Sequence, residues 1–291
     1  MRRLSLWLIC SLLVIAAPPV EARAKLNVVA SFSILGDFVR NVGGDRVNVT
    51  TLVGPNGDVH VYTPAPEDAK RIADARLVVI NGLGLEGWLP RLVQASGGKA
   101  SVVTATKGIA PRNLGSEIDP HAWQSVLNAK VYVSNIGKAL EAADPADAEI
   151  FRANERRYEE KLDELDREVR AAVEQIPPQR RKVISTHDAF GYFAAEYGIV
   201  FIAPLGVSTD AEPSARDIAA IVGQIRAARV PAVFFENITD PRLVRQIASE
   251  TGVKIGGPLY SDSLSPEKGA APTYIDMVRH NIKALTSALA D

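Results

Sequence analysis

The chain is poor in sulfur, with one cysteine and two methionines among 291 residues. The single cysteine, Cys10, lies in an apolar segment near the N-terminus, so the remainder of the chain contains no thiol. Without a second cysteine the chain forms no internal disulfide, and structural zinc sites made of cysteines are excluded. Any metal site in this protein must therefore use nitrogen and oxygen donors.

The chain also lacks an apolar run long enough for a membrane anchor near its N-terminus. The run of residues 4–17 is shorter than the roughly 20 apolar residues that a bilayer requires. Two arginines precede this run, and the small-residue site Ala22-Arg23-Ala24 follows it. This pattern is typical of a secretory signal peptide, so we expect cleavage of residues 1–24 and a mature protein free in the periplasm.

An excess of one charge sign is absent as well. The 33 basic and 34 acidic residues give a formal net charge of −1 at pH 7. Neither sign forms a long one-sided block, so the basic footprint of a polyanion-binding protein is missing. We therefore expect no nucleic-acid partner.

Apolar strand-like runs and helix-like segments alternate in two parts of the chain, and a charged helical region separates them. A chain of this length with 47% hydrophobic residues favours two lobes over a single one. The alternation predicts parallel βαβ units in residues 25–143 and again in residues 177–291. Between them, residues 144–176 predict a long linking helix that Pro177-Pro178 ends. The predicted fold class is α/β, with two parallel-sheet lobes joined by a rigid helix.

The individual elements follow from the periodicity of apolar residues. In the linking helix, five apolar residues spaced three or four apart predict one buried face: Tyr158, Leu162, Leu165, Val169 and Val173. Strands are expected at residues 26–32, 47–53, 77–80, 182–185, 199–203 and 232–236, and helices at 34–42, 66–75, 85–95, 189–197, 214–228, 241–251 and 273–290.

Histidine is scarce, and three of the four histidines lie in short segments typical of turns. His60 lies in Asp58–Pro64, His121 in Asp119–Trp123 and His187 in Ser185–Tyr192. A lone histidine of this kind is more often structural than a ligand, and no H-E-x-x-H pair is present. The hypothesis of a metal site therefore depends on the three histidines together. The fourth histidine, His280, has no motif around it and is expected to be an ordinary surface residue.

A loop aspartate completes this candidate set. Asp262 lies in Tyr260–Ser265, after an apolar segment of the second lobe, so each lobe supplies two candidates. Open α/β sheets bring such loops together at the carboxyl ends of their strands, and a cleft between lobes is a common ligand site. Three imidazoles and one carboxylate suit zinc, and they can also hold manganese or iron.

Five motifs in this order resemble the zinc/manganese solute-binding proteins of bacterial metal ABC transporters. They are Gly54–Pro64, Asp119–Trp123, Ser185–Phe193, Ala211–Ser214 and Tyr260–Leu264. The resemblance covers essentially the whole mature chain. It implies two α/β lobes joined by a backbone helix, with a metal held between the lobes and delivered to a membrane permease.

The resemblance also implies the ligands. His60, His121 and His187 match the three histidine positions of the family, and Asp262 matches its carboxylate position. Relatives that prefer manganese often have glutamate at the third position, so His187 favours Zn²⁺ over the alternative Mn²⁺. We expect a monomer whose partners are the permease of a metal ABC transporter and, where one exists, a periplasmic metallochaperone.

Two features depart from the family pattern. The zinc branch often carries a long histidine-rich loop before the second ligand motif. In this chain the corresponding loop, residues 105–119, is short and contains no histidine. A second metal site is therefore not expected. After Trp123 the family often continues with Leu-Asp-Pro, but this chain has Gln124-Ser125-Val126.

A zinc-dependent hydrolase is the alternative from another functional class. Zinc with three protein ligands and an open position activates water, and Asp188, Glu212 and Glu236 are candidate general bases. No motif assigns that role to any of them, so we expect a metal carrier and not an enzyme.

Overall fold

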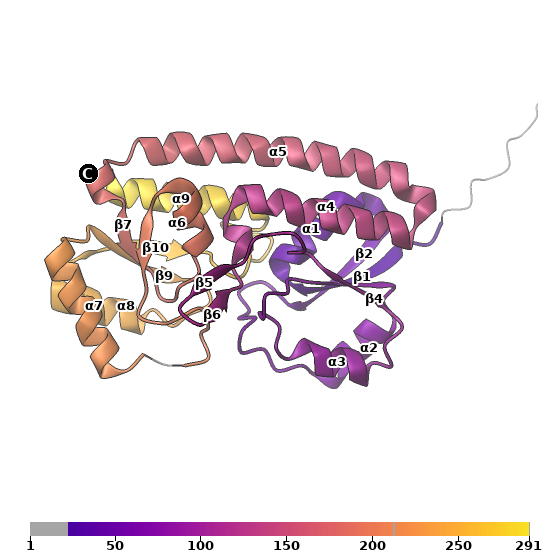
Figure 1. Cartoon of the computed structure of the whole chain (residues 1–291), viewed down its shortest axis with the longest axis horizontal. Helices are drawn as coiled ribbons and strands as arrows, with labels where there is room; N and C mark the ends of the chain where they lie inside the picture. Colours follow the sequence, from indigo (N-terminus) through magenta and orange to yellow (C-terminus); the bar gives the residue numbers. More distant parts are fainter. Residues whose placement is uncertain (1–22, 212, 291) are drawn as a thin grey trace, which may run out of the picture.

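The computed structural model describes residues 23–211 and 213–290 as two α/β halves beneath a layer of long helices (Figure 1). The proposed signal peptide lies almost wholly outside the described residues, as does Glu212. In the described part of the chain, no helix combines the length and apolar character needed to cross a membrane. Two parallel sheets and one long helix confirm the predicted α/β fold class.

The first half is a four-stranded parallel sheet in the order β2-β1-β3-β4. Its central strands are nearly continuous buried apolar runs, as expected for a parallel sheet covered on both faces. The strands are β1 (Leu26–Phe32), β2 (Val47–Val53), β3 (Leu77–Ile80) and β4 (Ser101–Thr104), and the accompanying helices are α1 (Ser33–Gly43), α2 (Pro66–Ala73) and α3 (Leu89–Ala95).

The second half repeats this arrangement with the order β10-β9-β7-β8, again with all strands parallel. Its strands are β7 (Lys182–Ile184), β8 (Val200–Ile202), β9 (Ala232–Glu236) and β10 (Lys254–Leu259), and its helices are α6 (Gly191–Tyr197), α7 (Ala215–Ala228) and α8 (Arg242–Thr251). In each sheet the strand order reverses beside the first strand of that half, and ligand sites are typical of the carboxyl edge at such a reversal.

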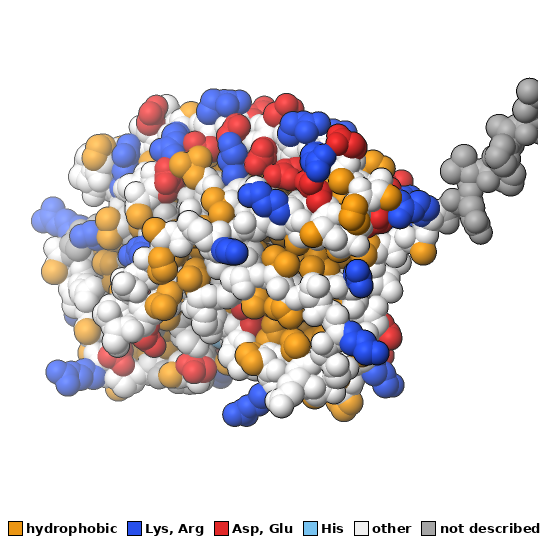
Figure 2. Space-filling model, turned by 45° about the vertical axis from the view of Figure 1, so that its right-hand side comes forward, with side chains coloured by type: hydrophobic (Ala, Val, Ile, Leu, Met, Phe, Trp, Pro, Cys, Tyr) orange, Lys and Arg blue, Asp and Glu red, His pale blue; other side chains and the backbone are white. Residues whose placement is uncertain are grey.

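Three long helices connect the halves: α4 (Val126–Ala143), α5 (Ala148–Glu174) and α9 (Tyr274–Leu289). Helix α5 spans both halves above α4 and α9 (Figure 1). The predicted apolar face of α5 is buried, and charges of both signs cover its outer surface in Figure 2. The helix begins at Ala148 and not at residue 144, because residues 145–147 form a short 3-10 turn that Pro145 begins.

One hydrophobic core runs through both halves. It joins the inner faces of both sheets with α1, α4, α5 and α9, and includes Phe38, Tyr132, Leu162, Phe234 and Tyr274. Two smaller clusters cover the outer faces of the sheets. Because both halves pack against the same helices, a wide separation of the halves would expose the shared core.

Some local structure differs from the expectation. Residues 85–88 form turns and α3 begins only at Leu89, since Gly84 precedes this stretch, Gly87 lies within it and Pro90 occupies the first turn of the helix. Edge strand β4 and a hairpin of β5 (Arg112–Leu114) and β6 (Glu117–Asp119) were not predicted. These strands are largely exposed and lack the buried apolar run from which the equally short β3 and β7 were predicted.

A buried carboxylate lies where α1, α5 and α9 meet. Asp37 accepts a hydrogen bond from the backbone N–H of Tyr274 at 2.9 Å and one from the hydroxyl of Tyr158 at 3.4 Å. Burial raises the pKa of Asp37 to about 6. An unfolded aspartate has a pKa of about 3.9. The free energy of unfolding contributed by this group therefore falls as the pH rises from about 4 to about 6, on the order of 3 kcal/mol in all.

We predict that Asp37→Asn raises the free energy of unfolding of the metal-free protein above about pH 6, by about 1 to 3 kcal/mol. The asparagine keeps an oxygen acceptor for the Tyr274 N–H and removes the buried charge. Denaturant unfolding of the variant and the wild type across pH 4 to 8 measures the effect. An identical pH dependence in the two proteins would contradict the role assigned to this carboxylate.

Candidate metal centre

His60 lies on the long loop between β2 and α2. The carboxylate of Asp58 accepts a hydrogen bond from the His60 backbone N–H at 2.9 Å. The indole N–H of Trp88 donates to the carbonyl of Val59 at 3.0 Å. These bonds shape the turn so that the His60 imidazole points inward, with 5% of its side chain exposed.

His121 follows β6 directly and precedes the 3-10 turn of residues 122–124. Asp119 Oδ1 lies 2.9 Å from His121 Nδ1 and accepts the His121 backbone N–H at 3.0 Å. The other oxygen of Asp119 pairs with Arg112 at 2.9 Å. A carboxylate at Nδ1 favours the tautomer in which that nitrogen carries the proton, which leaves the Nε2 lone pair free for a metal.

His187 follows β7, at the point where the strand order of the second sheet reverses. Glu236, the last residue of β9, accepts the backbone N–H groups of Thr186 and His187 at 2.8 and 3.0 Å. Its second oxygen lies 2.6 Å from His187 Nδ1, although the contact is not aligned as a regular hydrogen bond. Glu236 thus faces His187 as Asp119 faces His121.

Asp262 lies on the loop between β10 and α9 and is fully buried. Its Oδ2 atom is 3.1 Å from Nε2 of both His60 and His187, and its Oδ1 atom is 3.6 Å from His121 Nε2. Within the described residues, Oδ1 has no hydrogen-bond partner. Both oxygens therefore face the three imidazoles.

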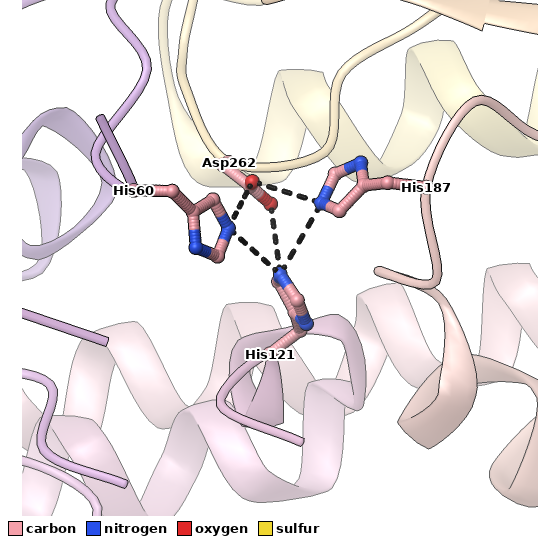
Figure 3. A group of neighbouring side chains, drawn as sticks. All are labelled: His60, His121, His187 and Asp262. Carbon is pink, nitrogen blue, oxygen red and sulfur yellow. Dashed lines mark hydrogen bonds and ion pairs between the residues drawn. The ribbon is translucent and has the colours of Figure 1, made fainter. Parts of the chain in front are cut away.

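The four side chains converge on one point between the halves (Figure 3). Nε2 of His121 lies 3.3 Å from Nε2 of both His60 and His187, and one donor atom from each of the four residues lies within 4.8 Å of all the others. Donors about 2.0 to 2.1 Å from a tetrahedral zinc ion lie about 3.3 Å apart. The spacing of the donors therefore fits a single metal ion of this size.

Charge at the cluster also fits a divalent cation. Asp119, Glu236 and Asp262 contact the imidazoles, and of these carboxylates only Asp119 has an arginine partner among the described residues. Burial lowers the pKa of His187, but Glu236 and Asp262 outweigh it and hold that pKa well above its usual value. Burial raises the pKa of Asp262, but the imidazoles, His187 foremost, outweigh it and hold that pKa well below its usual value. A dication can take the place of protons in such a cluster.

The His60 loop is bonded directly to the second half. Asp58 Oδ2 accepts the hydroxyl of Thr209 at 2.6 Å, and the side chain of Asn237 donates to Asn56 at 3.1 Å. Asp58 and Thr209 also line a cavity of about 460 Å³ beside the centre. Loops of both halves therefore close over the donors in this conformation.

All four predicted site residues are brought together, and His280 lies apart from them. His280 Nε2 is 3.2 Å from the carbonyl of Pro258, and its ring packs on Tyr260. The sequence reasoning missed the partners of the ligands. Asp58 and Asp119 each stand two residues before a histidine, a repeated signal that could have identified them. Glu236 had been considered only as a general base, and its contact with His187 depends on β9 lying beside β7.

Comparisons with known proteins agree with a metal-binding role. Residues 28–288 match the family described as zinc-uptake complex component A, periplasmic. The iron-binding protein YfeA of Yersinia pestis is 34% identical over 274 residues, which cover 92% of this chain and 87% of that protein. The manganese-binding lipoprotein MntA of Halalkalibacterium halodurans is 35% identical over 266 residues, with coverage of 91% and 89%.

Solved structures share the fold over their full length. The periplasmic zinc-binding protein TroA of Treponema pallidum superposes with a TM-score of 0.89 at 31% identity, covering 92% of this chain and 100% of that one. A manganese-bound periplasmic metal-binding protein of Candidatus Liberibacter asiaticus gives a TM-score of 0.83 at 34% identity, with coverage of 91% and 100%.

We predict that Glu236→Gln weakens metal binding by about 10- to 100-fold. The amide keeps one oxygen for the two backbone N–H groups but cannot hold the His187 proton on Nδ1 as a carboxylate does. Competition against a chelator measures the affinity. The matched control is Glu67→Gln, which alters an exposed glutamate of α2 and should leave the affinity unchanged. Equal affinities of Glu236→Gln and wild type would show that Glu236 does not support the ligand.

Proposed function

This chain belongs to the periplasmic zinc-uptake component A family, and we propose that the ion it carries is Zn²⁺. Like its relatives, it is the substrate-binding protein of an ABC importer and binds a divalent metal ion; it is not an enzyme. Such proteins work with a membrane permease and an ATPase. The alternative of a zinc-dependent hydrolase is therefore excluded.

The observation that carries the zinc proposal is the convergence of three imidazole nitrogens and one carboxylate within 4.8 Å. Nitrogen donors in a small tetrahedral arrangement suit zinc, whereas manganese favours more numerous oxygen donors. Relatives are named for iron, manganese and zinc, so overall similarity does not choose among these metals. The donor set supports zinc.

Manganese is the second candidate, and one observation favours it. Asp262 Oδ1 has no hydrogen-bond partner among the described residues and lies 3.6 Å from His121 Nε2. If both oxygens bound the ion, the site would have five donors, two of them oxygen, which suits manganese better than a four-donor site does. Iron, the third metal considered, is compatible with the same donors.

The proposed function also covers where the protein acts and to which partner it delivers the ion. We propose that the mature chain acts in the periplasm after cleavage of residues 1–24, as a monomer that passes the ion to the permease, with a metallochaperone as a further candidate partner. We also propose that residues 25–143 and 177–291 act as the two lobes, linked by residues 144–176. The bonds of Asp58 and Asn56 to the second half support closure around the ion.

We predict that protein isolated from the periplasm of cells grown with limiting zinc and manganese contains one ion per chain, and that this ion is zinc. The metal should also stabilise the fold, by about 4 kcal/mol at a thousandfold excess over Kd. Elemental analysis and thermal unfolding measure the two effects. His60→Ala should lose the bound metal, whereas the control His280→Ala should retain it. A periplasmic protein loaded mainly with manganese would overturn the zinc proposal.

We predict that His187→Glu loses zinc affinity by more than it loses manganese affinity. The change replaces a nitrogen donor with a hard oxygen donor, which suits manganese better. Zinc can still bind more tightly in absolute terms, because the Irving–Williams order favours it over manganese at most sites. Competition titrations of both metals compare the affinity ratio in the variant and the wild type. An unchanged ratio would mean that donor type at residue 187 does not set the preference.

A further inference from the structure

Gln124, the residue at which the chain departs from the family pattern, reaches the backbone next to a ligand of the metal centre. Its side-chain N–H donates to the carbonyl of Ser261 at 2.7 Å, and the indole N–H of Trp123 donates to the same oxygen at 2.9 Å. Both side chains are almost completely buried. A carbonyl oxygen has two lone pairs, and here both have donors from the His121 segment.

The segment before Asp262 is held on its other side as well. The side chain of Asn281 in α9 accepts the backbone N–H of Tyr260 at 2.8 Å and donates to the Tyr260 carbonyl at 2.7 Å. The hydroxyl of Tyr274 donates to the carbonyl of Trp123 at 2.7 Å, which ties α9 to the His121 segment. The two donors to the Ser261 carbonyl therefore hold the peptide bond that enters Asp262, and Asn281 holds the residue before it.

The carboxylate of Asp262 depends on this fixation. In the part of the chain that the structure describes, its recorded polar contacts are with the imidazoles of His60, His121 and His187. Among the described residues no other donor orients the carboxylate, so its position relative to the imidazoles follows from the backbone that carries it. The two donors to Ser261 act on that backbone.

We propose that Gln124 is a positioning residue for the metal centre, which orients Asp262 through the Ser261 carbonyl. This inference rests on the proposed metal-binding function of the same site. Gln124 joins the His121 segment to the Asp262 loop, so two of the four ligands keep their relative positions when the ion binds. Removal of its amide leaves Trp123 as the one donor from this segment, and Asp262 then has more freedom to turn away from the ion.

The test replaces Gln124 with methionine, an unbranched side chain of similar size without a donor. We expect metal affinity to fall by about three- to tenfold, the effect of one ordinary hydrogen bond, through faster dissociation. The visible absorption of bound Co²⁺, a probe of donor geometry, should also change. The matched control is Asn135→Leu, which removes an amide that donates to the carbonyls of Ala105 and Lys107 and should leave the Co²⁺ spectrum unchanged.

Separate measurements of folding and of metal binding distinguish the outcomes of this test. Circular dichroism and thermal unfolding of the metal-free variants establish that they fold, and Gln124→Leu serves as the second variant should the methionine variant not fold. A folded Gln124 variant with wild-type affinity, dissociation rate and Co²⁺ spectrum would overturn the positioning role. Failure of the wild type to bind Zn²⁺ or Co²⁺ would instead overturn the proposed function and this inference with it.

Discussion

Burial of two carboxylates beside three imidazoles is the constraint on which the centre depends. Asp262 and Glu236 are fully buried; both contact imidazoles, and Glu236 also accepts the backbone N–H groups of Thr186 and His187. Charges taken out of water are costly unless they are paired. A divalent ion relieves this cost, and it does so only where loops from both halves meet. A metal ion bound at this point would therefore tie loops of both halves together.

The shared core limits how far the two halves can move apart when a metal ion binds or leaves. Both sheets pack against α1, α4, α5 and α9 in one continuous cluster, so the halves cannot separate widely without exposing apolar side chains. The ligand loops are anchored in this cluster through Val59, Trp123 and Leu264, and individual hydrogen bonds such as that from Gln124 to Ser261 hold them as well.

The sequence was sufficient to predict the cluster of candidate ligands and most elements, because both leave local patterns. The apolar stripe of α5, from Tyr158 to Val173, and the four ligand motifs were predicted and then found together. The contacts between distant segments were not predictable in this way. Glu236 meets His187 only because β9 pairs with β7, and Gln124 meets Ser261 across 137 positions of sequence. Strand order and loop packing decide such contacts, and neither has a local signature.

X-ray absorption spectroscopy of the zinc-loaded protein tests the central claim most directly. We expect one zinc ion with three imidazole nitrogens and carboxylate oxygen at about 2.0 to 2.2 Å. The imidazole signal should weaken in a His121→Ala variant, since Nε2 of this histidine is one of the converging donors. A wild-type spectrum without imidazole scattering, or one with only oxygen donors, would contradict a centre built from His60, His121, His187 and Asp262.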